Sequence, residues 1–166
     1  MKMSDGVEQA IHSVAMLSGL SEGGVLSAAA LAEFHGVSTS YLLKHLQALS
    51  GAGILDTVPG PRGGYRLAKP PEEISLLDIL LAVEGPAPAF RCAEIRQRGP
   101  SQVSDRFFAK PCTISAAMLR AERVYRAELA KTSIADLGIE LNALDDGSIA
   151  ARGCAFLEIH ERKTAR

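Results

Sequence analysis

The chain has 166 residues, of which 18 are basic and 19 acidic, so its formal net charge at pH 7 is −1. The chain therefore lacks the overall positive charge of proteins that bind nucleic acid without sequence preference. No run of about 18 apolar residues is present and the N-terminus lacks a signal-peptide pattern, so we expect no membrane span and a cytoplasmic location. The odd number of cysteines, three, argues against a disulfide framework and favours metal or redox roles.

The start of the chain has the pattern of an amphipathic helix, with a stripe at Val7, Ile11, Val14 and Ser18. Glu8 and His12 lie at the edge of this stripe, four residues and therefore one helical turn apart on the same face. In most proteins such a pair is simply solvated and contributes about 0.2–0.5 kcal/mol. A role as metal ligands depends on residues elsewhere in the chain.

Residues 27–53 follow the order helix, turn, helix. An alanine-rich helix over 28–33 is followed by the turn His35-Gly36-Val37 and by a second helix whose N-terminus Ser38 can cap. Gly51 and Gly53 end this second helix, because glycine tolerates the positive φ of a helix C-terminus. A helix of this size fits the major groove of duplex DNA, where its first turn reaches base edges.

A hairpin is expected directly after these helices. The strand-like runs 54–58 and 64–67 flank Pro-Gly-Pro-Arg-Gly-Gly, which has the composition of a turn. Arg62 lies at its tip, placed for a phosphate or a narrow minor groove. From residue 38 to 69 four basic residues face one acidic residue, a local net charge of +3.

These features together predict a winged helix-turn-helix that binds double-stranded DNA. The expected contacts are the major groove for Thr39, Ser40, Tyr41 and Lys44, the minor groove for Arg62, and phosphates for Arg66 and Lys69.

Beyond the wing, residues 74–84 predict a short helix that is apolar on all sides, ended by Gly85-Pro86, and its burial between the domain and a dimer partner is expected. Residues 87–111 are a loop long enough to be functional or disordered. A long helix over 113–131 then carries an apolar stripe at Ile114, Met118, Ala121, Tyr125 and Leu129. A twofold dimer through this helix would pair two DNA half-sites, although packing onto the chain's own N-terminal domain would also cover the stripe.

These motifs resemble the Rrf2 family of bacterial transcriptional regulators over roughly residues 3–137. The resemblance rests on segments 38–42, 62–67, 74–79 and 83–86 and on a cysteine shortly after them. It implies a mainly α fold with a small β wing, a homodimer with a long dimerisation helix, and often an iron–sulfur cluster that switches DNA affinity. We expect a DNA-binding domain over 1–70, a cluster loop and dimerisation helix over 71–137, and a tail over 138–166.

The cysteine spacing departs from the family's best-known cluster motif, which has three closely spaced cysteines in the loop. Here Cys92 and Cys112 are twenty positions apart, and Cys154 lies in the tail. A [2Fe–2S] cluster takes four ligands, so two cysteines leave two positions for other donors. Some Rrf2 regulators recruit a carboxylate from the start of the partner's first helix. By this similarity and by ligand counting, we expect Cys92 and Cys112 of one subunit, with Glu8 and His12 of the other, to hold one cluster at each of two interface sites.

Other interpretations of the cysteines stay open. Cys92 and Cys112 could form a reversible disulfide, as in a thiol-based redox switch, or be inert. The nearby cations Arg91, Arg96, Arg98 and Lys110 are expected to lower the thiol pKa values, which suits a ligand and a reactive thiol equally.

A protein-interaction module and an enzyme are the two other function classes that the sequence leaves open. Winged helices serve as cluster-free protein-interaction modules as well as DNA binders. An enzyme has the least support, because the sequence offers no paired catalytic carboxylates, no Ser/His/Asp constellation and no phosphate-binding glycine loop. In the tail, residues 155–159 fit a helix or a strand, and Cys154 and His160 are more often incidental than ligands.

Overall fold

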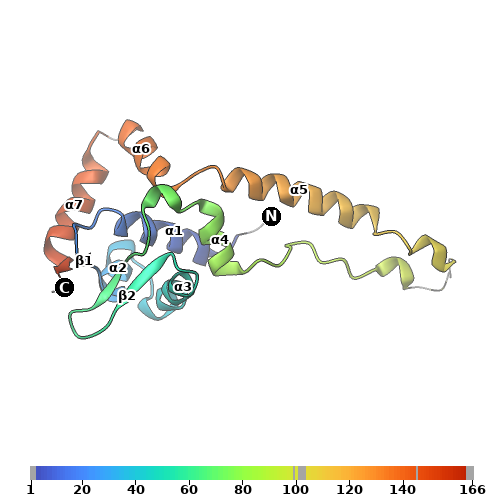
Figure 1. Ribbon diagram of the computed structural model, residues 1–166, viewed down its shortest axis with the longest axis horizontal. Coiled ribbons are helices and arrows are strands. Elements are labelled where there is room, and N and C mark those ends of the chain that lie inside the picture. Colours follow the sequence, from blue (N-terminus) through green and yellow to red (C-terminus); the bar gives the residue numbers. More distant parts are fainter. Residues whose placement is uncertain (1–2, 99, 101–103, 145, 164–166) are drawn as a thin grey trace.

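The computed structural model describes residues 3–98, 100, 104–144 and 146–163. It has two parts, a helical body with two small sheets and an arm that extends from one side of it (Figure 1). The arm consists of α5 (Thr113–Leu129) and the described parts of segment 86–111, which runs beside α5 and contains the short helices η2 (Ile95–Gln97) and η3 (Asp105–Phe107). No helix in the described part of the chain is long and apolar enough to cross a membrane.

Three helices form the centre of the body: α1 (Asp5–Leu17), α2 (Ala28–His35) and α3 (Thr39–Gly51). The turn between α2 and α3 depends on Gly36, whose φ of 66° lies in the left-handed region that favours glycine. Ser38 precedes α3 as predicted, but its hydroxyl bonds the Ser40 hydroxyl at 3.0 Å and caps no backbone N–H. Gly51 is still helical, and Gly53, with φ of 71°, is the glycine that turns the chain.

The predicted wing is present as an antiparallel hairpin of β2 (Leu55–Val58) and β3 (Gly64–Leu67). A third strand, β1 (Gly24–Val25), reaches the wing through the bridge between Leu26 and Tyr65. At this bridge the backbones approach so closely that a Cβ on Gly64 would collide with the Leu26 carbonyl. Glycine is therefore required where the wing meets the helical core.

The core of the body also includes residues that follow the wing. After η1 (Pro71–Glu73), helices α4 (Leu76–Glu84) and α6 (Ile134–Leu144) start side by side, joined by a bridge between Ser75 and Ser133. The buried Ile74 and Ile134 pack with the core of α1, α2 and α3. Although α4 is as apolar as the sequence indicates, only Ile79 and Leu80 on it are buried, while Leu76, Ala82 and Val83 are half-buried against the same core.

The tail folds back onto the body. Helix α7 (Ser148–His160) packs against α2, where the rings of Phe156 and Phe34 lie 4.9 Å apart and Leu157 is buried. Strand β4 (Arg162–Lys163) pairs antiparallel with β1. Residues 155–159 are thus helical, and the three predicted segments share one core, so the division of the chain into domains stays a prediction.

Candidate DNA interface and cysteine pair

The first turn of α3 presents polar side chains to the surface. Its inner face is anchored by Leu42, Leu46 and Leu49, all fully buried. The predicted groove-reading residues lie on the outer side and are exposed: Thr39, Ser40, Tyr41 and Lys44. These four side chains are therefore accessible from solvent on the side of α3 opposite the core.

The basic residues of the wing differ in their surroundings. Arg62 is exposed in the turn between β2 and β3. Arg66 pairs with Asp56 at 3.4 Å, and Lys69 lies 4.0 Å from Asp78. Because surface ion pairs contribute only about 0–1 kcal/mol, either cation could exchange its carboxylate for a phosphate.

A buried histidine joins α1 to the recognition helix α3. His45 of α3 is 7% exposed, and a Cβ added to Gly6 of α1 would overlap its ring. Burial, and secondly the charge of Lys44, lowers the pKa of His45, and its Nε2 has no hydrogen-bond partner among the described residues. A displacement of α1 would therefore act directly on α3. His45 was not predicted as a functional residue, because its position on the helix carries no chemical signal in the sequence.

Glu8 and His12 are exposed on α1, one turn apart as predicted. The ring of His12 lies 5.6 Å from that of His35 at the end of α2, and both line a shallow surface cavity with Glu8. The pKa of His35 is lowered, first by burial and then by His12 and Arg152. His35 was not predicted as a neighbour of the pair, since it is 23 positions away from His12 in the sequence.

Cys92 and Cys112, in contrast, come together in the arm. Cys112 immediately precedes α5 and is 8% exposed. The backbone N–H of Ser115 is the main cause of its lowered pKa, against the opposing effect of burial, with smaller contributions from the Ile114 N–H, Arg96 and the Cys92 side chain. A helix N-terminus stabilises a thiolate, so Cys112 is suited to ligate a metal or to react.

Cys92 has the opposite electrostatic setting. It is exposed and its thiol donates to the Glu94 carboxylate at 3.5 Å. The backbone N–H of Glu94 favours the thiolate, but desolvation and the Glu94 carboxylate outweigh it and raise the pKa of Cys92. The expectation that nearby cations lower both thiol pKa values is therefore wrong for Cys92. Arg96 is paired with Glu94 at 2.7 Å, and the other three cations named from the sequence are not among the causes of either shift.

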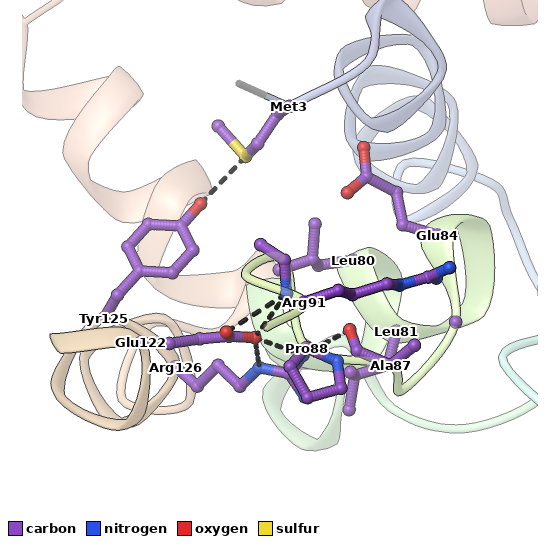
Figure 2. Close-up of a pocket in the computed structure, with 12 residues that line it drawn as sticks. Met3, Leu80, Leu81, Glu84, Ala87, Pro88, Arg91, Glu122, Tyr125 and Arg126 are labelled. Atoms are coloured by element: carbon purple, nitrogen blue, oxygen red, sulfur yellow. Dashed lines mark hydrogen bonds and ion pairs between the residues drawn. The ribbon is translucent and has the colours of Figure 1, made fainter. Parts of the chain in front are cut away.

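A buried carboxylate on α5 holds the segment after α4 in place at the base of the arm (Figure 2). Glu122 is the single buried residue of α5; it accepts the Ala89 N–H at 3.1 Å and pairs with Arg126 at 2.6 Å. Arg126 in turn donates to the carbonyls of Pro86 and Ala87, at 3.2 and 3.0 Å. These contacts hold the segment that leads to Cys92 against α5. No spacing rule identified this role of Glu122 and Arg126 from the sequence.

The same view shows a cavity of about 290 Å³ between α4, α5 and the N-terminus, where Tyr125 donates to the Met3 sulfur at 3.0 Å (Figure 2). Further out, the apolar stripe of α5 is open: Ile114 is 64% exposed and Met118 46%.

The two predicted ligand pairs do not meet within one chain. Helix α1 lies in the body, whereas the start of α5 lies at the outer end of the arm (Figure 1). Among the described residues, no group of three or more His, Cys, Asp or Glu side chains could hold a metal ion. Cys92 and Cys112 could supply two of the four ligands that a [2Fe–2S] cluster needs, and the described part of the chain brings no group of three or more such donors together there.

Comparison with known proteins agrees with this architecture. The model of the Rrf2 family, described as iron-dependent transcriptional regulators, matches residues 3–139. YffB of Lactococcus lactis, which bears the provisional name of an HTH-type transcriptional regulator, is 34% identical over 140 residues, covering 84% of this chain and 88% of YffB.

Solved structures share the fold. IscR of T. potens superposes with a TM-score of 0.62 at 20% identity, covering 89% of this chain and 91% of IscR. The oxidised form of CymR from Staphylococcus aureus gives a TM-score of 0.60 at 26% identity, covering 82% of this chain and 95% of CymR.

Proposed function

This chain belongs to the Rrf2 family of HTH-type transcriptional regulators, which are not enzymes, and we propose that it is a redox-responsive, sequence-specific member that senses through a [2Fe–2S] cluster at the interface of a homodimer. In each of two equivalent sites, Cys92 and Cys112 of one subunit and Glu8 and His12 of the other supply the ligands. The observation that carries this proposal is that Cys92 and Cys112 are close enough to affect each other's pKa, on an arm whose apolar stripe is uncovered.

Dimerisation through α5 accounts for two otherwise unsatisfied features. It covers Ile114 and Met118, which a monomer leaves in water. It also brings the cysteine pair of one arm to the body of the second subunit, where the exposed Glu8 and His12 are available on α1. A twofold arrangement makes both sites identical and matches two DNA half-sites.

The cluster would supply a change of one electron at the subunit boundary, and histidine ligation favours a higher reduction potential than four thiolates. The chain's own residues carry that change to DNA. His12 and Glu8 belong to the same helix as Gly6, which rests against His45 of α3. A small movement of α1 therefore re-spaces the two recognition helices, and a few kcal/mol of difference changes DNA occupancy by orders of magnitude.

Anaerobic purification tests this proposal. We expect a coloured protein with about two irons and two sulfides per protomer, and loss of absorbance and iron in Cys92→Ala, Cys112→Ala, Glu8→Ala and His12→Ala. Cys154→Ala is the matched control, because this thiol is exposed on α7 and away from the arm. Four ligand variants that retain wild-type absorbance and iron content would contradict the assignment.

A second candidate, a thiol switch without a cluster, is supported by the same proximity of Cys92 and Cys112. In that mechanism hydrogen peroxide oxidises the two thiols to a Cys92–Cys112 disulfide. The thiols give up two protons and two electrons in total, and these reduce the peroxide to two water molecules. The two mechanisms differ in their dependence on α1. His12→Ala and Glu8→Ala would leave disulfide formation intact, whereas they would remove ligands from a cluster.

A further inference from the structure

We propose that the C-terminal strand β4 extends the DNA-binding surface, with Arg162 contacting a backbone phosphate beside the one approached by the wing. This inference rests on the DNA-binding part of the proposed function and is independent of the cluster. It concerns a segment beyond residue 139, where the match to the family ends.

The position of β4 is fixed by several separate contacts. Its backbone pairs with β1 in the register Gly24↔Lys163 and Val25↔Arg162. Just before the strand, the Glu161 carboxylate accepts hydrogen bonds from the hydroxyl and the backbone N–H of Ser21. Leu157, one turn earlier on α7, is buried against the body. The tail is thus docked on the body at its end.

This docking connects the tail to the wing through β1. Strand β1 lies between β4 and the wing, because Leu26 and Tyr65 exchange backbone hydrogen bonds of 3.0 and 2.7 Å. The strands therefore follow the spatial order β4, β1, β3, β2. The edge of β1 that would otherwise be open is covered by a strand made of two basic residues, Arg162 and Lys163.

Arg162 reaches the turn that carries the predicted minor-groove residue. Its Nη1 donates to the carbonyl of Pro61 at 3.2 Å, next to Arg62 in the chain. A guanidinium has five N–H donors in a planar fork, so one carbonyl bond leaves donors for a phosphate. No carboxylate pairs with Arg162 among the described residues, in contrast to Arg66 and Lys69 of the wing.

The geometry distinguishes Arg162 from its neighbour. Successive residues of a strand point to opposite faces, so Lys163 points away from the face on which Arg162 meets the wing turn. Lys163 carries the same positive charge at neutral pH and is also exposed, which makes it a matched control for charge alone.

The test is the salt dependence of DNA binding. The full-length protein and its variants are titrated, over a series of KCl concentrations, into a labelled duplex selected from a random-sequence library by the wild type. Arg162→Gln keeps a donor for the Pro61 carbonyl but loses the charge, and Arg162→Lys keeps the charge. We expect Arg162→Gln to weaken binding roughly tenfold and to reduce the slope of log K against log salt by about one per DNA-binding domain. Arg162→Lys should retain most of the slope, and Lys163→Gln should have the smaller effect.

The outcomes separate the possible failures. Arg62→Ala could weaken DNA binding while Arg162→Gln has no larger effect on affinity and salt slope than Lys163→Gln. That result would overturn the role of the tail but would leave the contact between the wing and DNA in place. If neither Arg62→Ala nor Arg162→Gln has an effect, the wing does not touch DNA and the inference falls with it. A wild type that selects no duplex would overturn the proposed function itself.

Discussion

The recognition helix α3 and the longer arm helix α5 differ in what covers their apolar sides. Helix α3 buries three leucines in the body, whereas the stripe of α5 is open and its one buried side chain is the carboxylate of Glu122. Helix α3 is therefore packed within one chain, whereas α5 leaves an apolar stripe that the proposed dimer would cover. The proposed DNA-binding surface can thus be described from a single subunit, whereas the proposed cluster site cannot.

The largest effect is expected from breaking the arm. Met118→Glu places a charge in the uncovered stripe, so the subunits should separate while each body stays folded. Loss of the second half-site should weaken operator binding by about 10²- to 10⁴-fold. Sedimentation velocity and binding titrations measure both effects, with Met118→Leu as the control. A variant that remained dimeric would show that subunits associate elsewhere.

Shortening a buried side chain of the body should instead lower the stability of the fold. Leu46→Ala leaves a cavity at a fully buried position of α3 and should lower the free energy of unfolding by about 2–5 kcal/mol. Ile114→Ala, introduced into the Met118→Glu background, should change it by less than about 0.5 kcal/mol. Urea unfolding compares the two substitutions. Equal losses would mean that the arm is packed onto its own body, which was the alternative considered from the sequence.

A smaller and local effect is expected at the base of the arm. Glu122→Gln removes the charge that pairs with Arg126 and accepts the Ala89 N–H, and the cost should be about 1–3 kcal/mol. Faster amide exchange at Ala89, with unchanged exchange in α3, is the expected signature. Glu128→Gln is the control, because its pair with Lys131 is exposed. Unchanged exchange at Ala89 would mean that this carboxylate does not hold the segment.

The smallest effect concerns pH. The pKa values of His35 and His45 are both lowered from 6.5, mainly by burial. Below that pH the two histidines are therefore protonated more readily in the unfolded chain than in the native state. Stability should therefore be complete above that pH and fall as the pH decreases through the native pKa values. Urea midpoints at pH 7.5 and 5.5 measure the loss. His35→Gln and His45→Gln should each reduce it, and variants as acid-sensitive as the wild type would refute this origin.

The sequence predicted the body well because its elements follow from local patterns. The hairpin, for example, is specified by glycine and proline at the turn, and the end of α4 by Gly85. What it missed depends on distant contacts. His35 beside His12 and Glu122 beside Ala89 are brought together by tertiary structure. The tail strand was also missed, since two basic residues carry no pattern by which a strand is recognised.

The most direct test of the account is a mixed dimer. One subunit carries Cys92→Ser and Cys112→Ser, the other carries Glu8→Ala and His12→Ala, and two different affinity tags isolate the heterodimer anaerobically. Ligands shared between subunits leave one of the two sites intact, so we expect about one cluster per mixed dimer, half the wild-type iron and absorbance, and none in either variant homodimer. A mixed dimer without iron, beside a wild type that contains it, would contradict ligation across the interface.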